Sequence, residues 1–299
     1  MIDIWHDAER IYFEHGVVLL RVDESNWQCE SAVRQYSTSP NEIIHQFRLR
    51  PILAKYRTTP DFPYSMVFPS HTGKALNVQL SELQQLIYKE KNSAYFIATQ
   101  SLFFLLTAAI YHCERIAEQY AASLAQMIKF PNPKNADRIV TACYEGFFEF
   151  DALVTGVIRA VDSTRYIIWR EYGAKGSVPS SFCRTIDNCI NLPDTLKQLS
   201  ESLWDKRLAH AKEYRDCIQH YVAVGSSSWA MMTRVGELIW TLLLRIPDNP
   251  EAKSAKKFTY KLDLDAMTYA WELIGDLFTL TNCVIHSVLE KNKEAKKSI

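Results

Sequence analysis

The amino-acid sequence predicts a mainly α-helical protein, with a β-hairpin between its last two helices and a small α+β part at its N-terminus. Only 9 glycines and 11 prolines interrupt its 299 residues, so long helices are expected. Apolar residues make up 47% of the chain, which is enough for a sizeable core. The apolar spacing is helical over most of the later part of the chain and becomes strand-like in one stretch near its end. We therefore expect an uncertain α+β segment over residues 1–80 and a helical domain over residues 81–299.

Prolines and glycines mark the expected ends of the long helices, because proline cannot continue the backbone hydrogen-bond ladder. The stretch "FPNPK" at 130–134 ends the first helix, and "GAKGSVPSS" at 173–181 ends the second. The third helix starts directly after Pro193. The four expected helices cover about 80–130 with a break near Asn92, then 136–172, then a stretch from Asp194 that includes 211–224, and finally 264–291.

A change of pattern between the third and fourth helices predicts the hairpin. The stretch "MMTRVGELIWTLLLRIPDNP" is rich in apolar and β-branched residues, and "KKFTYKLDLD" alternates apolar with polar residues. The intervening "PDNPEAKSAK" has the composition of a turn. We therefore expect a hairpin within about 229–262. Near the N-terminus, "RIYFEHGVVLLRVDE" is compatible with a pair of strands.

Charge and composition exclude several classes of function. Lys and Arg together number 34, as do Asp and Glu, so any nucleic-acid contact must come from a local basic patch. The opening "MIDIWHDAER" lacks the apolar stretch of a secretory signal. The apolar run 94–110 contains polar residues and is shorter than the about 20 residues needed to span a bilayer, so we expect a buried helix and no membrane association. The four lysines near the C-terminus are expected to be a solvated end: Lys291, Lys293, Lys296 and Lys297.

The seven cysteines are scattered singly, an odd number without C-x-x-C spacing. This usage is typical of reduced thiols and predicts a cytoplasmic protein. The sequence also lacks the glycine-rich phosphate-binding motifs of nucleotide enzymes and the H-E-x-x-H motif of zinc proteases.

One motif in the third helix carries groups that can do chemistry. The stretch "RDCIQH" runs from Arg215 to His220, and ideal helical spacing of about 100° per residue places Lys212, Asp216 and His220 away from the apolar stripe. Arg215 lies at the edge of that stripe. Asp216 and His220 are four residues apart, so the carboxylate is expected to accept a hydrogen bond from the imidazole and orient it.

The pattern "RDCIQH" resembles the signature of the HEPN superfamily, an arginine followed by a polar residue and, a few residues later, a histidine. The fragment "YEGFFEFDALVTGVIRAVDSTR", Tyr144 to Arg165, is similar to the helix that precedes this motif in some larger members. The resemblance covers about 137–290. It implies a four-helix bundle that commonly forms a homodimer, so that two motifs line one cleft.

Many members of this superfamily are metal-independent endoribonucleases, in which the RNA 2'-hydroxyl attacks the adjacent phosphate. The resemblance therefore implies the same activity for this chain. His220 would then be the general acid/base, Arg215 would stabilise the phosphate charge, and Asp216, where asparagine is more common, would support the imidazole. Lys212 is a candidate for contact with the RNA backbone. No cofactor and no metal are needed for this scheme.

Three alternatives remain open for the motif. It can be a solvated helix face with one local ion pair, or a homodimer contact without chemistry. The protein can also be a catalytically silent interaction or scaffold protein of the same fold, with an unknown partner.

A zinc site is a further alternative, because C-x2-H occurs twice, at Cys217 and His220 and again at Cys283 and His286. On their helical wheels both pairs lie away from the apolar stripe of their own helix, so they are not expected to meet inside a bundle.

Other polar residues have simpler interpretations. His112 and Cys113 lie in an apolar helix, where a core histidine with satisfied hydrogen bonds is expected. Glu145 and Glu149 share one helix face and Asp151 lies close by, which is typical of the polar side of an amphipathic helix.

Overall fold

The structure is a computed structural model, and its contacts divide the chain into two compact units. It describes residues 4–6, 10–13, 18–23, 26–28, 76–89, 93–128, 138–141, 143–174, 176–226, 228–235, 239–262 and 264–297. The first unit comprises 1–54, 111–153 and 213–271, and the second comprises 55–110, 154–212 and 272–299. Most of the predicted segment 1–80 lies outside the described residues, so its division from the rest of the chain stays a prediction.

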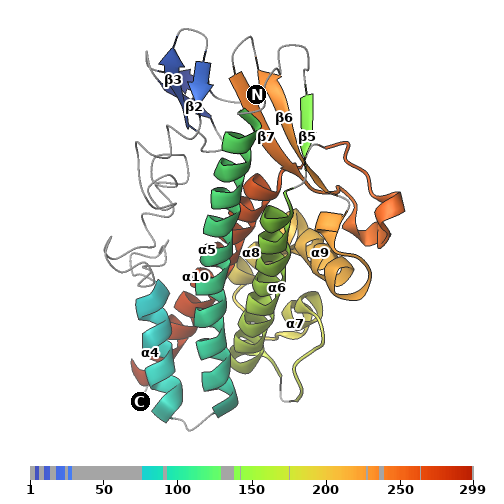
Figure 1. Cartoon of the computed structure of the whole chain (residues 1–299). Coiled ribbons are helices and arrows are strands. Elements are labelled where there is room, and N and C mark those ends of the chain that lie inside the picture. Colours follow the sequence, from blue (N-terminus) through green and yellow to red (C-terminus); the bar gives the residue numbers. More distant parts are fainter. Residues whose placement is uncertain are drawn as a thin grey trace. The chain divides into compact units, whose positions relative to one another are not determined.

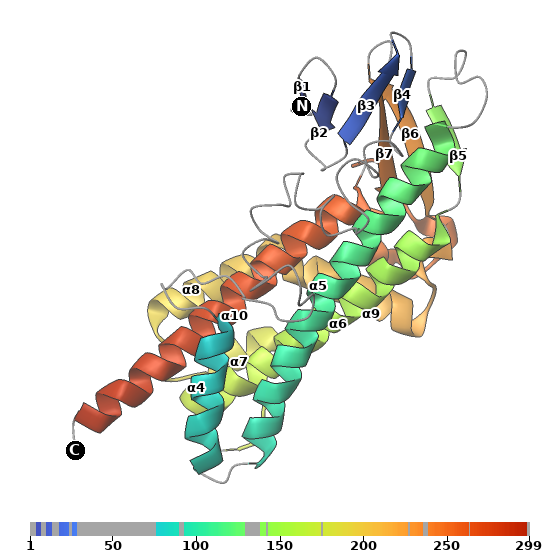
Figure 2. The same cartoon turned by 60° about the vertical axis from the view of Figure 1, so that its left-hand side comes forward.

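The second unit is built from helices, and the prediction of a mainly α-helical protein is confirmed for the described residues (Figures 1 and 2). A break near Asn92 was expected, and one helix does end before it and the next begin after it. The helices that contribute to this unit are α4 (Leu76–Lys89), the start of α5 (Ser93–Ile128), most of α6 (Tyr144–Tyr172), α7 (Phe182–Asn188), α8 (Asp194–Leu203) and most of α10 (Ala266–Lys297).

The predicted third helix begins at Asp194, directly after Pro193, as expected. It continues from α8 through a π-helical turn, Trp204–Leu208, into α9 (Ala209–His220). Within the helical unit this turn directs Arg207 into an ion pair with Asp276 of α10, and Lys206 Nζ lies 3.1 Å from the same carboxylate. The buried carboxylate is therefore paired with two cations, as a buried charge requires.

Over residues 93–116, helix α5 is buried on one face only. Leu102, Leu106 and Ile110 are completely buried, whereas Ile97 and Phe104 are more than half exposed. The expectation of a buried helix over 94–110 therefore holds for one of its two faces.

By length and composition, two of the described helices could cross a membrane. These are Ser93–Ile116 and Ala266–Ala295, with 39% and 67% of their most apolar windows buried in the protein. Core helices of soluble proteins meet the same criterion of length and composition.

The first unit contains the strands. A three-stranded antiparallel sheet has the order β5-β6-β7, and its bounds are Arg138–Thr141, Trp229–Val235 and Ile239–Arg245 (Figure 1). A second antiparallel sheet near the N-terminus consists of β1 (Ile4–His6), β2 (Arg10–Phe13), β3 (Val18–Asp23) and β4 (Asn26–Gln28). Strands β2 and β3 are the pair for which "RIYFEHGVVLLRVDE" suggested strands.

The second predicted helix begins later than expected. Residues 136–141 were assigned to it, but Arg138–Thr141 form β5 and pair with β6, and α6 begins only at Tyr144. Ile139, Val140 and Thr141 are β-branched, which favours a strand once a partner strand is present. Helical periodicity alone did not reveal that partner.

The predicted hairpin has a different turn from the one expected. Both of its strands lie within 229–245, and β6 pairs with β7 in antiparallel register from Trp229↔Arg245 to Val235↔Ile239. The stretch 256–265 was expected to be the second strand, but the strand pairing of its described residues is limited to an isolated bridge, Arg245↔Asp265. Its backbone N–H groups are instead bonded by the side chains of Asp248 and Asn249, an arrangement that competes with a strand ladder.

Three aromatic residues form the centre of the first unit. Tyr214 of α9 packs edge-on against Phe150 of α6 and Tyr269 of α10, with ring centroids 5.5 Å and 5.4 Å away. The Tyr214 hydroxyl donates a hydrogen bond to the carbonyl of Pro247, and the side chain is completely buried. Asp265 accepts from the N–H groups of Leu244 and Thr268, and so links the end of β7 to the start of α10.

Tyr214→Ala should lower the free energy of unfolding by about 3–5 kcal/mol, because a large buried aromatic ring is lost. Tyr214→Phe keeps the ring and leaves the Pro247 carbonyl without its donor, so a loss of about 1–3 kcal/mol is expected. Urea unfolding followed by circular dichroism measures both values. A Tyr214→Phe protein as stable as the wild type would contradict the role of the hydroxyl.

Candidate functional site

The predicted motif lies on α9, and two of its three members contact each other. Arg215 Nε lies 2.8 Å from Asp216 Oδ1, and both side chains are about a fifth exposed. Asp216 was expected to orient His220. Asp216 contacts the Arg215 guanidinium at this distance, and the orientation of His220 by Asp216 stays a prediction.

His220 is the last residue of α9, and its side chain is exposed. Its ring contacts Tyr221 nearly edge-on, with centroids 6.3 Å apart and an interplanar angle of 80°. Lys212, the candidate for RNA backbone contact, lies two turns earlier on α9 and is half-buried. An exposed imidazole at the end of a helix is accessible to a large substrate.

Lys253 joins this group from a loop that sequence reasoning did not connect to the motif. Its Nζ lies 5.0 Å from the centroid of the Tyr221 ring, within cation–π range. Lys253 has a left-handed backbone conformation, with φ 54°, at the end of a short 3-10 turn. His220 and Lys253 therefore both contact Tyr221, which is 56% exposed.

Cys217 lies on the buried side of α9. Its thiol donates to the carbonyl of Val222, and burial, with a further contribution from the charge of Asp151, raises the pKa of this thiol. The zinc alternative requires Cys217 as a ligand, but the side chain is completely buried and holds its proton for a backbone acceptor. No cluster of three or more histidine, cysteine or acidic side chains suited to a metal occurs in the part of the chain that the structure describes.

An imidazole–carboxylate pair does occur in the first unit, away from the motif, between helices α5 and α6. His112 Nδ1 of α5 lies 2.6 Å from Glu149 Oε2 of α6, and each side chain is about a quarter exposed. His112 was expected to be a satisfied core histidine, and it does have a partner, but it is half-buried rather than buried. The two residues are 37 positions apart, so no local spacing could have revealed the pair.

Asp151 is a titratable group without a partner near α9. Its Oδ1 is buried and has no hydrogen bond among the described residues. Burial raises the pKa of the Asp151 carboxyl to about 7. The carboxylate and the Cys217 thiol influence each other electrostatically, which places Asp151 close to the buried side of the motif helix.

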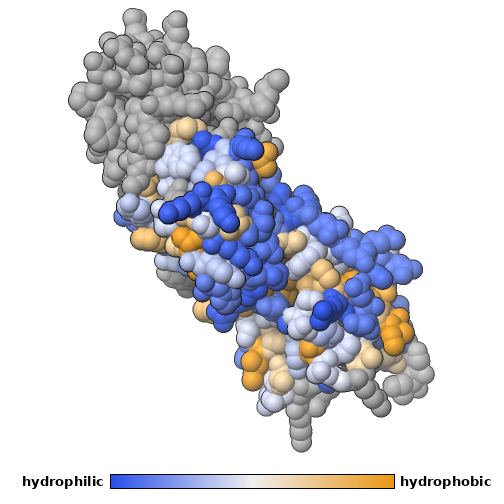
Figure 3. All heavy atoms as spheres, turned by 90° about the vertical axis from the view of Figure 1, so that its right-hand side faces the viewer, coloured by the Kyte–Doolittle hydropathy of each residue, from blue (hydrophilic) through white to orange (hydrophobic). Residues whose placement is uncertain are grey.

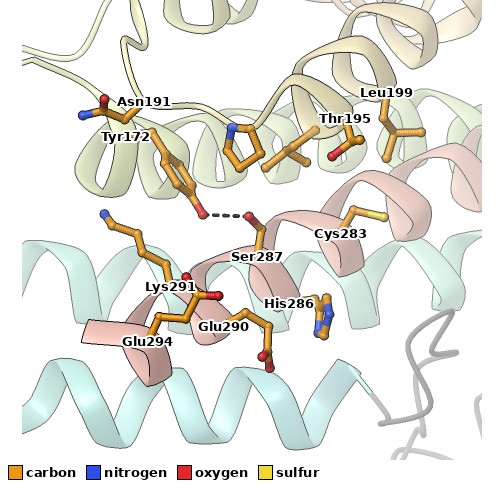
Figure 4. A pocket seen from close by; sticks show the side chains of 12 residues that line it. Tyr172, Asn191, Thr195, Leu199, Cys283, His286, Ser287, Glu290, Lys291 and Glu294 are labelled. Carbon is orange, nitrogen blue, oxygen red and sulfur yellow. Dashed lines mark hydrogen bonds between the residues drawn. The ribbon is translucent and has the colours of Figure 1, made fainter. Parts of the chain in front are cut away.

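The helical unit contains a separate pocket of about 630 Å³ (Figure 4). Tyr172 and Ser287 are hydrogen-bonded to each other in it at 2.7 Å, and Lys291 lies over the Tyr172 ring while pairing with Glu171. Cys283 and His286, the second pair of the zinc alternative, line this pocket and belong to the helical unit, whereas Cys217 and His220 belong to the other. The polar groups at the centre of the pocket, Tyr172 and Ser287, are thus already hydrogen-bonded to each other.

Comparison with known protein families, with curated proteins and with solved structures finds no match to this chain. The interpretation of the motif therefore depends on the residues and contacts described above.

Asp151→Asn should stabilise the protein at alkaline pH. The ordinary pKa of this carboxyl is near 3.8, so between about pH 4 and pH 7 the folded state holds one proton more than the unfolded state. The free energy of unfolding of the wild type therefore falls as pH rises through this window. Asparagine does not ionise, so the stability of the variant does not fall in this window. The variant should be more stable than wild type at pH 8, by up to about 4 kcal/mol, and about as stable as wild type at pH 4.

Urea unfolding at both pH values measures this difference. Asp187→Asn, at an exposed position on α7, is the matched control and should give no comparable gain. An Asp151→Asn protein that is no more stable than wild type at pH 8 would refute a buried, unpaired carboxyl at this position.

Proposed function

We propose that the chain is a metal-independent endoribonuclease of HEPN type, which cleaves RNA by attack of the 2'-hydroxyl in a cleft between two copies. The observation that carries the proposal is the exposed imidazole of His220 on the same helix as the partly exposed side chain of Arg215. A group that moves a proton and a group that stabilises phosphate charge are the two parts that this reaction needs. The four-helix bundle and the homodimer are part of the proposal.

The contact between Arg215 and Asp216 changes the role that we give to the aspartate. An arginine side chain has five N–H donors in a planar fork, and Asp216 lies at ion-pair distance from the buried Nε without a hydrogen bond of good geometry to it. The terminal amino groups then remain for two oxygens of one phosphate, which is the geometry that arginine recognises best. Asp216 is thus a positioning residue for Arg215, while His220 is the acid/base group.

Lys253 offsets an unfavourable charge at this site. The carbonyl end of a helix carries a partial negative charge, which opposes binding of a phosphate beside His220. The ammonium of Lys253 and the guanidinium of Arg215 supply positive charge within the same unit. Cleavage in the cytoplasm is consistent with the six described cysteines, which are all free thiols.

A catalytically silent interaction protein is the alternative. It is favoured by the apolar side chains that α5 exposes, among them Ile97, Phe103 and Phe104, because contiguous exposed apolar residues are typical of binding surfaces. RNA cleavage by the purified protein distinguishes the two functions.

The wild type is expected to cleave mixed single-stranded RNA in the presence of EDTA, since no step of the scheme uses a metal. His220→Ala and Arg215→Ala should each lower the cleavage rate by about 100-fold or more, because each removes a group that acts on the reacting phosphate. Gel electrophoresis of end-labelled RNA gives the rates.

Two matched variants serve as controls. His286→Ala changes a histidine of the helical unit, and Arg159→Ala changes an exposed arginine of α6. Both should cleave at the wild-type rate. RNA that stays intact with the wild type, or that both motif variants cut at the wild-type rate, would refute the proposed function.

A further inference from the structure

Residues 250–262 of the loop after β7 are locally basic, although the whole loop, 246–265, contains four lysines and four acidic residues and the chain as a whole has no net charge. Residues 250–262 contain four lysines and one acidic residue, Glu251. All four lysines are exposed, and none forms an ion pair with another described residue. The lysines of this basic loop are Lys253, Lys256, Lys257 and Lys261.

The basic loop is held in a defined conformation. Asn249 donates from its amide to the carbonyl of Lys257 and accepts from the N–H of Thr259, so one side chain closes the loop across its base. Asp248 accepts from the N–H groups of Lys261 and Leu262. The lysine ammonium groups therefore project from a fixed backbone, which lowers the entropy lost when they bind a ligand.

Aromatic contacts attach the same loop to the sheet. The rings of Trp229 on β6 and Tyr260 in the loop have centroids 4.3 Å apart. The guanidinium of Arg245 lies 5.3 Å from the centroid of the Trp229 ring and donates to the carbonyl of Tyr260. Arg245 is thus used to secure the loop, whereas the four lysines remain exposed.

The basic loop begins beside the proposed catalytic histidine. Lys253 contacts Tyr221, and Tyr221 contacts His220, so the basic loop meets the end of α9 through Lys253, and the other three lysines follow within eight residues along the chain. Figure 3 views the side that carries α9 and this loop, and hydrophilic side chains cover much of it. A polyanion that places one phosphate at His220 can extend onto this surface.

We infer that the basic loop is a binding surface for the phosphate backbone of single-stranded RNA, next to the catalytic motif. This inference rests on the proposed function and names the residues that hold the substrate. Lysines bind backbone phosphates as point charges and give affinity without sequence preference. The exposed ring of Tyr221 adds a surface against which a base can stack, a contact that every base can make.

The test measures binding separately from cleavage. A short 2'-O-methyl RNA, which lacks the attacking hydroxyl, is titrated with the full chain at several salt concentrations, and fluorescence anisotropy gives the association constant. The double variant Lys256→Ala/Lys257→Ala removes two loop lysines that make no described hydrogen bond through their side chains. Its slope of log K against log salt should be less steep than that of wild type by about 1.4, because each phosphate contact on a single strand contributes about 0.7.

A second double variant, Lys197→Ala/Lys293→Ala, is the matched control, because both lysines are exposed or nearly so and lie in the helical unit. It should retain the wild-type slope. Unchanged melting curves of both double variants establish that they fold. Equal slopes for the wild type and the loop variant would overturn the inference.

The outcomes separate this inference from the proposed function. Binding that depends on the loop lysines, combined with no cleavage of ordinary RNA, supports the surface and refutes the nuclease. Cleavage with equal salt slopes refutes the surface alone. Binding of a poly-glutamate peptide or of phosphatidylserine vesicles in preference to RNA also overturns the inference.

Discussion

The contact of Tyr214 with Phe150 and Tyr269 is the constraint on which the arrangement of the candidate site depends. It joins α6, α9 and α10 within one unit through rings that are 5.4–6.0 Å apart. The Tyr214 hydroxyl also donates to the carbonyl of Pro247, three residues before the segment 250–262 that carries the four lysines. One buried side chain thus fixes both the helix that bears His220 and the start of the basic loop.

The burial of Tyr214 also determines which side chains of α9 face the core and which face solvent. Tyr214 and Cys217 face the core, so Arg215, Asp216 and His220 lie toward the partly or fully exposed side. The short link between Arg215 and Asp216 keeps the guanidinium near the helix, where its charge is partly neutralised. Lys253 restores positive charge at the end of α9, and it does so from a segment more than 30 residues further along the chain.

Local features of the fold could be predicted from the sequence, whereas pairings between distant residues could not. Pro193 and the break near Asn92 set helix ends through the backbone alone, and both helix ends agree with the structure. Strand β5 was missed because its four residues become a strand only when β6 is beside them. The hairpin turn was misplaced because Asp248 and Asn249 hold the later segment through side-chain bonds that alternation does not reveal.

In the candidate site, too, local features could be predicted from the sequence and contacts between distant residues could not. Helical spacing predicted that Asp216 and His220 share the side of α9 away from its apolar stripe, but the contact between Asp216 and Arg215 depends on side-chain geometry. The bond between His112 and Glu149 and the contact between Lys253 and Tyr221 each join separate elements. Such contacts arise from packing, and a pattern within one helix carries no information about them.

The central claim is that RNA binds at the end of α9, beside the His220 imidazole. Nuclear magnetic resonance of protein labelled at its eight histidines tests it directly, with signals assigned from His220→Ala and His112→Ala proteins. Addition of uncleavable single-stranded RNA should shift the ring signals of His220 and leave those of His112 unchanged. RNA that binds to saturation without any change in the His220 signals would contradict the account.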